Sequence, residues 1–226
     1  LFSILIILYS IFRSLIFLLI NRPSLVFGMG GYSSFPVCIA ATILRIPFII
    51  YENNLYIGKA NRYLLPYAKK IFVSYKELEG ISWKYHKKVC EIGNIIRKEI
   101  LNFQITSDSN QNDRKLKILI LGGSQAAKIF AEKLTKIFKE CNEAKIPLKI
   151  YQQCLPEQNK FLSSFYRSLN IDFEIFNFSN NILDYFSKIN LAITRSGSSM
   201  LAELLNVKIP FISVPLPSSA DDHQLK

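Results

Sequence analysis

The stretch ITRSGSSMLAELLNVKIPFISVPLPSSADDHQ, residues 193–224, decides the fold of this chain. An apolar run ends at Thr194, a helical pattern follows over 198–206, and a second apolar run covers 210–215. A buried strand, a helix and another buried strand in this order form a βαβ unit, in which both strands run parallel in one sheet. The hydroxyl-rich turn after the first strand lies where such sheets bind their ligands.

The same alternation extends through most of the chain. Strands with their following turns are expected at 24–31, 47–52, 70–75, 87–94, 116–125, 147–152, 172–178, 190–197 and 210–215. Helices are expected between them at 34–45, 58–67, 125–140, 156–168, 180–188 and 198–206. The segment 98–115 is polar and lacks a sustained period, which is typical of a linker. The sequence therefore predicts an α/β fold with two Rossmann-like domains, 1–97 and 116–226, whose parallel sheets face a cleft.

The amino-acid composition indicates which kinds of partner and ligand to expect for this chain. The chain has 28 Lys and Arg against 17 Asp and Glu, a formal net charge of +11 that favours an anionic partner. No aromatic-basic nucleic-acid motif is present, so phosphate-bearing ligands and an anionic membrane surface are expected rather than DNA or RNA. The four cysteines are far apart and only two histidines occur, which argues against a zinc site or a disulfide framework. Neither a metal nor a cofactor is expected.

The first helical segment is unusually apolar. Residues 1–20, LFSILIILYSIFRSLIFLLI, have the length and composition of a membrane span. A narrow polar stripe that includes Ser10, Arg13 and Ser14 runs along this segment, and a charge near the middle of a span is costly in lipid. We therefore expect a largely buried helix or one that lies on a membrane surface, in preference to a true span.

Two turns in the first half carry glycines or amides that suit an anionic ligand. FGMGGYSSFP places Gly30, Gly31 and Tyr32 between a strand and a helix, as an acceptor-side or phosphate loop would. Glu52 ends the next strand near the spacing at which a dinucleotide fold binds ribose, which leaves a nicotinamide oxidoreductase open as an alternative. YENN places Asn54 beside Glu52, where amides either contact sugar hydroxyls or cap the following helix.

Two further turns lie in the second half. LGGSQAAK places Ser124 at a helix start, and TRSGSSMLAE does the same for Ser198 and Ser199, with Glu203 one turn later. Backbone amides and the helix dipole favour a phosphate at such positions, and a carboxylate there can accept hydrogen bonds from a ribose diol. The plainer interpretation of each turn is an ordinary serine N-cap. If both turns bind one ligand, they should converge on a single pyrophosphate pocket.

These motifs, taken in order, resemble the MurG family of bacterial glycosyltransferases. GMGGYSSFP, YENN…GKANR, GNIIR, GGSQAAK, TRSGSSMLAEL, IPFISVPLP and DDHQ follow the family's order and approximate spacing from Pro23 to Gln224. The resemblance implies a GT-B fold and an inverting, metal-independent transfer of N-acetylglucosamine from UDP-GlcNAc to undecaprenyl-pyrophosphoryl-MurNAc-pentapeptide, which converts lipid I to lipid II. It also implies a role in peptidoglycan synthesis, cell shape and division, and peripheral attachment to the cytoplasmic face of the inner membrane.

The resemblance assigns a donor site by motif. The residues that match family positions contacting UDP-GlcNAc are Asn54, Arg97, Ser124, Ser179, Ser198, Ser199, Met200, Leu201, Ala202, Glu203 and Gln224. Among them, Ser179 falls where the family contacts uracil through its backbone, and Gln224 where it contacts the sugar. Helix starts together with Arg97 would offset the charge that builds on UDP as it leaves.

The chain also departs from the family pattern. Tyr51 replaces the histidine of the family's H-E-Q-N, and Ile95 replaces the proline of G-N-P-V-R. The family's glycine-rich loop, with a histidine proposed as the base, is expected to precede Leu1, which leaves Glu52 as the catalytic candidate within this chain. The final helices of the second domain are expected to follow Lys226. The chain alone is then expected to be inactive, and a non-catalytic membrane-associated binder of nucleotide sugars stays open as a second alternative.

Overall fold

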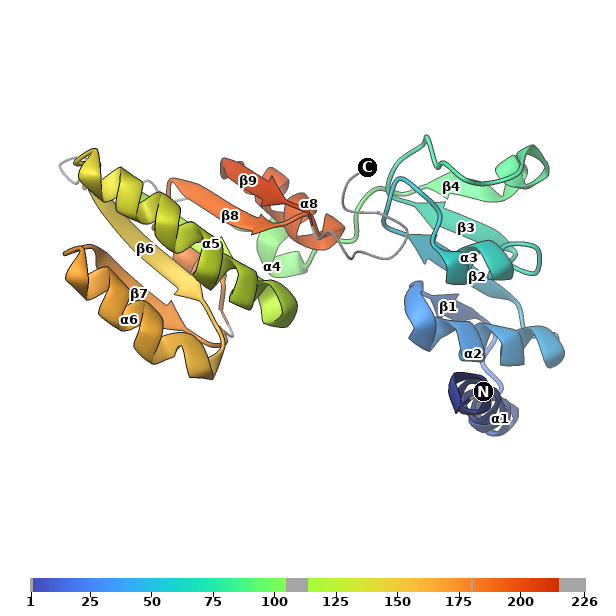
Figure 1. Cartoon of the computed structure of the whole chain (residues 1–226). Helices are drawn as coiled ribbons and strands as arrows, with labels where there is room; N and C mark the ends of the chain where they lie inside the picture. Colours follow the sequence, from blue (N-terminus) through green and yellow to red (C-terminus); the bar gives the residue numbers. More distant parts are fainter. Residues whose placement is uncertain (1, 105–113, 180, 216–226) are drawn as a thin grey trace. The chain divides into compact units, whose positions relative to one another are not determined.

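A computed structural model describes residues 2–104, 114–179 and 181–215 (Figure 1). Within these residues the chain divides into two compact units, the first ending at Ile95 and the second beginning at Ile96. Each unit contains a parallel sheet of its own. The prediction of an α/β fold with two parallel sheets is therefore confirmed.

The first unit is built on a parallel sheet in the order β1-β2-β3-β4. Its strands are β1 (Val26–Gly28), β2 (Phe48–Glu52), β3 (Lys70–Val73) and β4 (Val89–Glu91). Four of the five residues of β2 are buried. A strand in a parallel sheet has both faces covered, which explains why FIIYE has no alternating polar positions.

Helices complete the first unit. They are α1 (Phe2–Asn21), α2 (Gly31–Ile43), α3 (Lys59–Leu64) and the 3₁₀ helix η1 (Trp83–Lys88). α2 begins at Gly31, three residues before the expected start, because Gly30 adopts φ 78° and turns the chain directly from β1 into the helix. Cys38, Ala40 and Ala41 of α2 join Ile50 and Ile71 of the sheet in the core of this unit.

The helix α1 is exposed along most of its length. Leu18 is buried against the core and Leu15 is partly buried, and Figure 1 shows α1 lying beside α2. Large apolar side chains in contact with solvent include Ile4, Leu5, Leu8, Tyr9, Phe12, Phe17, Leu19 and Ile20. α1 is long and apolar enough to cross a membrane, and only 6% of its most apolar window is buried within the structure. Of the two forms expected for this segment, the largely buried helix is therefore wrong.

The second unit contains a parallel sheet in the order β7-β6-β5-β8-β9. Its strands are β5 (Leu116–Leu121), β6 (Leu148–Gln153), β7 (Asp172–Phe176), β8 (Leu191–Arg195) and β9 (Phe211–Val214). From the central strand β5 the chain proceeds outward through β6 and β7, then returns to the other side of β5 for β8 and β9. This reversal creates a topological switch point between β5 and β8, where open α/β sheets bind their ligands.

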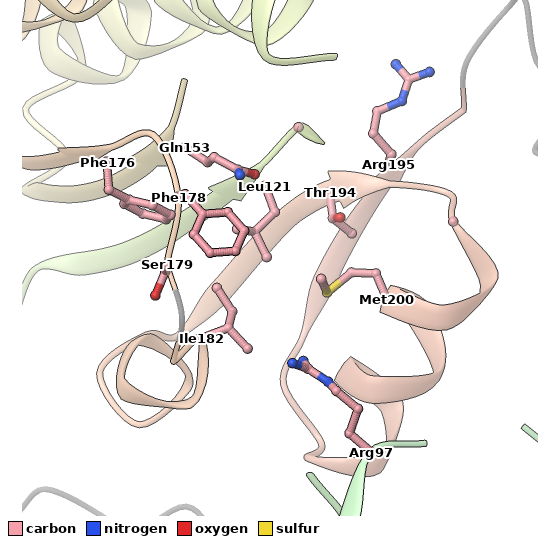
Figure 2. Close-up of a pocket in the computed structure, with 12 residues that line it drawn as sticks. Arg97, Leu121, Gln153, Phe176, Phe178, Ser179, Ile182, Thr194, Arg195 and Met200 are labelled. Carbon is pink, nitrogen blue, oxygen red and sulfur yellow. The ribbon is translucent and has the colours of Figure 1, made fainter. Parts of the chain in front are cut away.

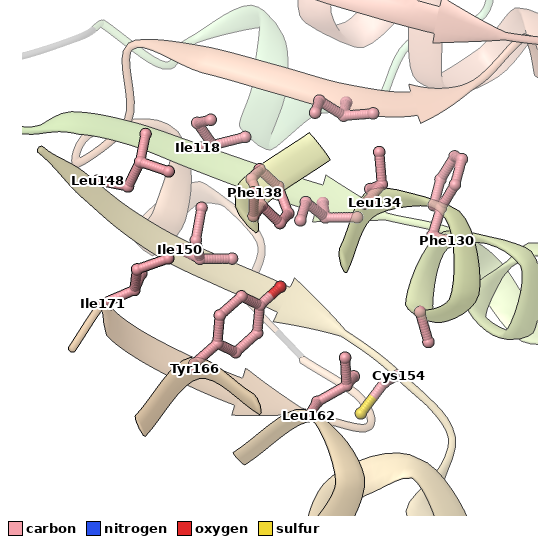
Figure 3. Packing of buried hydrophobic residues seen from close by; sticks show 13 residues of the cluster. Ile118, Phe130, Leu134, Phe138, Leu148, Ile150, Cys154, Leu162, Tyr166 and Ile171 are labelled. Carbon is pink, nitrogen blue, oxygen red and sulfur yellow. The ribbon is translucent and has the colours of Figure 1, made fainter. Parts of the chain in front are cut away.

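Helices cover both faces of this sheet. They are α4 (Lys98–Leu101), α5 (Gly123–Glu143), η2 (Pro156–Gln158), α6 (Asn159–Ser168), α7 (Leu183–Phe186) and α8 (Ser198–Asn206). On one face, Phe130 and Phe138 of α5 and Tyr166 of α6 pack on Ile118 and Ile150 (Figure 3). On the other face, Ile100, Phe186 and Leu204 pack on Leu119 and Tyr151.

The start of the expected linker 98–115 belongs to the second unit. Residues 98–101 form α4, whose Ile100 is fully buried beside Leu204 of α8. This short helix lacks a long apolar period, so its single deeply buried side chain left no pattern in the sequence. The polar residues 105–113 of the same segment lie outside the described part of the chain.

Candidate functional site

A cavity of about 470 Å³ opens at the carboxyl end of the second sheet (Figure 2). Its lining residues are Arg97, Leu121, Gly122, Gln153, Phe176, Phe178, Ser179, Ile182, Thr194, Arg195, Gly197 and Met200. Most of them come from the ends of β5, β6, β7 and β8 and from the segments that follow these strands, whereas Arg97 precedes α4 and Met200 lies in α8. The cavity therefore lies at the switch point that the strand order defines.

One wall of this cavity is apolar and partly aromatic. Phe178, Ile182 and Leu121 lie together in Figure 2, with Met200 across from them. The ring of Phe176 stacks on that of Tyr185, with the two centroids 4.6 Å apart and an interplanar angle of 18°. Phe178 is 76% exposed, so its ring is available to a ligand. A flat heterocyclic base is the kind of group that such a wall binds by stacking.

Two helix starts also line the cavity. Gly122 precedes α5 and Gly197 precedes α8, and each is the N-cap residue of its helix. The N-cap residue of both helices is therefore a glycine, which has no side chain with which to cap the helix, and not the serine considered for these turns. Backbone N–H groups at helix starts favour a phosphate. Both turns line one cavity, as expected for a pyrophosphate site.

A bidentate ion pair borders the cavity. Nε of Arg97 donates to Oε1 of Glu203 and Nη2 donates to Oε2, both at 2.8 Å. The Glu203 side chain is 10% exposed, whereas that of Arg97 is 54% exposed. The hydrogen bonds that Arg97 donates to Glu203 raise the pKa of Arg97 above its ordinary value, so the guanidinium stays charged. A carboxylate has about four lone-pair positions, so Glu203 retains room for further donors such as hydroxyls.

A second arginine lines the same cavity without a carboxylate partner. Arg195 ends β8, and its Nη2 atom is buried with no hydrogen-bond partner among the described residues. Burial lowers the pKa of Arg195, as expected for a guanidinium that lacks a nearby anion. In Figure 2 its side chain extends away from Phe178 and Met200. Arg195 thus adds positive charge at the polar end of the cavity.

A smaller cavity, of about 210 Å³, lies in the first unit. It is lined by Met29, Gly30, Gly31, Tyr32, Glu52, Asn53, Asn54, Gly58, Lys59, Ala60 and Asn61. Gly30 and Gly31 adopt φ values of 78° and 73°, which favour glycine. A Cβ atom on Gly30 would lie 3.2 Å from Nδ2 of Asn61. This loop therefore needs glycine for both its conformation and its close packing.

Glu52 holds the wall of this smaller cavity together. Its Oε1 accepts hydrogen bonds from the backbone and side-chain nitrogens of Asn54, at 3.1 and 2.9 Å. Its Oε2 accepts from the amide of Gly58 and from Nδ2 of Asn61, each at 2.9 Å. Glu52 is 4% exposed. These bonds assign it a role in fixing the β2–α3 connection, and its role as a catalytic base stays a prediction.

The structure places the predicted site residues in two groups. Asn54 and Glu52 share the smaller cavity with the loop residues Gly30, Gly31 and Tyr32. Arg97, Ser179 and Met200 line the larger cavity. Ser198, Ser199, Leu201, Ala202 and Glu203 lie on α8 beside it, with Ala202 and Glu203 buried. Ser124 lies in the first turn of α5, its side chain outside the description, and Gln224 lies outside the described residues.

Several lining residues were not predicted. Gln153, Thr194 and Arg195 end their strands, and Phe178 follows the end of β7. Their position was available from the sequence, because ligands bind beyond the carboxyl ends of parallel strands. Ile182, on the approach to α7, carried no comparable signal.

Two family models match the chain. The glycosyltransferase family 28 N-terminal domain matches residues 1–73, and the glycosyltransferase family 28 C-terminal domain matches residues 117–226. The smaller cavity lies within the first match and most of the larger cavity within the second. These matches give no support to a nicotinamide oxidoreductase.

Curated relatives carry one enzyme name. The UDP-N-acetylglucosamine--N-acetylmuramyl-(pentapeptide) pyrophosphoryl-undecaprenol N-acetylglucosamine transferase of Rickettsia bellii is 36% identical over 95% of this chain and 61% of its own length. The protein of the same name from Pelagibacter ubique is 34% identical over 97% of this chain and 60% of its own length. The chain therefore spans about three fifths of the length of these relatives.

Comparison with solved structures is consistent with the family matches. The crystal structure of Acinetobacter baumannii MurG matches 97% of this chain and 60% of its own length, with a TM-score of 0.73 and 27% identity. The S. aureus MnaA-UDP co-structure matches 91% of this chain and 60% of its own length, with a TM-score of 0.61 and 16% identity, which shows a shared fold alone. Taken together with the curated relatives and the solved structures, the two family models show that the chain belongs to glycosyltransferase family 28, and within that family it is similar to MurG.

Proposed function

We propose that the protein transfers N-acetylglucosamine from UDP-GlcNAc to undecaprenyl-pyrophosphoryl-MurNAc-pentapeptide in peptidoglycan synthesis. The observation that carries this proposal is the composition of the 470 Å³ cavity, which combines an aromatic wall, two helix starts with glycine at the N-cap and Arg97, whose guanidinium is paired with Glu203. A uridine diphosphate has a matching set of parts. The names of the relatives support the choice of sugar and acceptor.

The donor is expected to lie along the cavity in a defined direction. Uracil stacks on the wall that contains Phe178 and approaches the backbone at Ser179. The ribose hydroxyls donate to Glu203, whose carboxylate Arg97 orients through two hydrogen bonds. The pyrophosphate then accepts hydrogen bonds from the amides at the starts of α5 and α8.

This placement explains how the chain assists the reaction. The acceptor hydroxyl gives its proton to a general base as its oxygen bonds to the anomeric carbon, the bond between that carbon and the phosphate oxygen breaks, and UDP leaves with the electron pair. Negative charge therefore grows on the pyrophosphate. The helix starts and Arg195 stabilise that charge, because their dipoles and positive charge are already positioned before the bond breaks.

We assign the acceptor to the smaller cavity of the first unit. Its positive-φ glycines expose the start of α2, and the amides of Asn53 and Asn54 lie in the same wall. Such groups suit a pyrophosphate and sugar hydroxyls. The acceptor's long prenyl chain would remain in the membrane.

Isothermal titration of UDP into the chain tests the donor assignment. Glu203→Ala should weaken UDP binding by about tenfold to a hundredfold, because it removes hydrogen bonds to a charged group and leaves Arg97 unpaired. Glu132→Ala changes an exposed carboxylate on α5 and should bind like the unmodified chain. A folded chain that does not bind UDP, or equal affinity in the two variants, would contradict the assignment.

We also propose that α1 attaches the protein to the cytoplasmic face of the inner membrane. Its exposed apolar side chains would enter the lipid interface, and the net charge of +11 would attract anionic headgroups. Binding to anionic vesicles should exceed binding to neutral ones and should fall as salt is added.

A pair of variants separates the apolar contribution from the electrostatic one. Leu8→Asp on α1 should reduce sedimentation with anionic vesicles severalfold, whereas Ile137→Asp at a similarly exposed position on α5 should not. Equal partition into neutral and anionic vesicles would exclude the electrostatic contribution. Equal sedimentation of the two variants would exclude α1 as the attachment site.

A further inference from the structure

The side chain of Tyr51 turns away from solvent at the end of β2. It is 3% exposed, and its ring lies 6.5 Å from that of Phe27 in a stacked arrangement. Its hydroxyl lies 2.7 Å from Oγ of Ser74 and 2.9 Å from Oδ1 of Asn53. Tyr51 therefore reaches from its own strand to the end of β3 and to the wall of the smaller cavity, which Asn53 lines.

The same hydroxyl contacts the segment that follows β4. It lies 3.2 Å from the carbonyl oxygen of Gly93 and accepts a hydrogen bond from the amide of Ile95, also at 3.2 Å. Gly93 adopts φ 78°, a left-handed conformation at which the chain changes direction. Ile95 is the last residue of the first unit before the chain passes into the second.

The single phenol proton has three possible acceptors at this point. Tyr51 can donate to Asn53, to Ser74 or to Gly93 at one moment, but to only one of them. Ser74 also lies 2.8 Å from Oδ1 of Asn53 and can donate there when Tyr51 donates to Gly93. The hydrogen bonding of Asn53 and that of the 93–95 segment are consequently linked through one buried hydroxyl.

We propose that Tyr51 is a positioning residue that couples the smaller cavity to the 93–95 segment. A ligand that orders Asn53 also orders the hydroxyl and, through it, Gly93 and Ile95. The coupling is a property of this chain's own tyrosine. It rests on the proposed function only in taking the lipid-linked acceptor as the ligand of the cavity.

Amide hydrogen exchange on the free, full chain tests whether the Tyr51 hydroxyl holds the 93–95 segment. Tyr51→Phe removes the hydroxyl but keeps the ring and its contact with Phe27. The Ile95 amide should then exchange on the order of tenfold faster, while the amides of Ile50 and Phe72 in the sheet remain protected. Tyr67→Phe, at a tyrosine that is 61% exposed, is the matched control and should leave all three unchanged. Unchanged exchange at Ile95 in Tyr51→Phe would overturn the proposal.

Adding an acceptor tests the coupling. A short-chain prenyl-pyrophosphoryl-MurNAc-pentapeptide should slow exchange at Ile95 severalfold in the unmodified chain and in Ser74→Ala, which keeps the Tyr51 hydroxyl. It should have no effect at Ile95 in Tyr51→Phe. Acceptor that binds without slowing Ile95, or that slows it equally in Tyr51→Phe, would overturn the coupling. Acceptor that fails to bind at all would contradict the acceptor assignment, and exchange in the free chain would still decide whether Tyr51 holds the segment.

Discussion

The two cavities occupy equivalent places in their units but are lined by different kinds of residue. Both lie beyond the carboxyl ends of parallel strands, next to a glycine turn that starts a helix. The cavity of the second unit has an aromatic wall and two arginines. The cavity of the first unit is held by a buried carboxylate and amides that bond mainly to each other. The fold thus determines where a ligand binds, and the residues after each strand determine which ligand it is.

The difference extends to rigidity. In the first unit, most polar groups of the cavity wall are hydrogen-bonded within the protein, so the wall is largely preformed before a ligand arrives, and Oδ1 of Asn61 is the exception, with no partner among the described residues. In the second unit, Phe178 is largely exposed and an arginine nitrogen is unpartnered among the described residues, so part of the interaction is left for the ligand to complete. Substitutions in the first cavity should therefore affect stability, and those in the second should affect binding.

The largest expected effect is at Glu52. Glu52→Ala leaves the donors of Asn54, Gly58 and Asn61 without their acceptor, which should destabilise the first unit by about 3 kcal/mol. Urea unfolding followed by the fluorescence of Trp83, the one tryptophan of the chain, measures this change. Glu77→Ala, at an exposed carboxylate of the same unit, should have little effect. Equal stability of the two variants would remove the contrast between the cavities.

The glycine turns should respond differently to alanine. Gly30→Ala places a Cβ at φ 78° and 3.2 Å from Asn61, which should cost about 2 kcal/mol in the same unfolding measurement. Gly197 has φ −82° and no atom within 4 Å of an added Cβ, so Gly197→Ala should leave stability nearly unchanged. Similar losses in both variants would mean that the two turns are equally constrained.

A substitution at Phe178 in the second cavity should affect binding rather than stability. Phe178→Ala should weaken UDP binding about tenfold in a calorimetric titration, the amount expected when one base loses its aromatic partner. Stability should hardly change, because the ring is 76% exposed. Phe161→Ala on α6 removes another exposed phenylalanine and serves as the control. Loss of stability without loss of affinity would reverse the roles given to this residue.

The smallest effect concerns pH. Burial raises the pKa of Cys38, in the core of the first unit, from 9.0 to about 11. The unfolded chain then releases the thiol proton before the folded chain does, so the contribution of Cys38 is intact below pH 9 and is lost as the pH rises towards 11. At pH 10 this should lower stability by at most about 1.4 kcal/mol relative to Cys38→Ala. An identical pH dependence in the variant would show that Cys38 does not contribute.

Much of the fold followed from local pattern. Apolar runs such as FIIYE and LKILIL predicted buried parallel strands, because a strand covered on both faces needs no polar positions. The short helix α4 was missed, since one deeply buried side chain, Ile100, leaves no period to detect. The exposure of α1 could not be predicted from the sequence either, because an apolar helix has the same composition whether protein or lipid covers it.

The site was predictable to a lesser degree. Glycines and serines at strand ends indicated both turns, since those residue types suit a phosphate at a helix start. The pairing of Arg97 with Glu203 joins residues 106 positions apart, and no local pattern encodes such a contact. Tyr51 gave no sign in the sequence that its hydroxyl would point inward to the segment after β4.

The position of Arg97 has a practical consequence for dissecting the protein. A donor-binding fragment designed from the strand pattern alone would start near Leu116 and would lack both the partner of Glu203 and the buried Ile100. Such a fragment would expose an apolar pocket under α8 and carry an unpaired, nearly buried carboxylate. A fragment that starts at Ile96 would retain both groups.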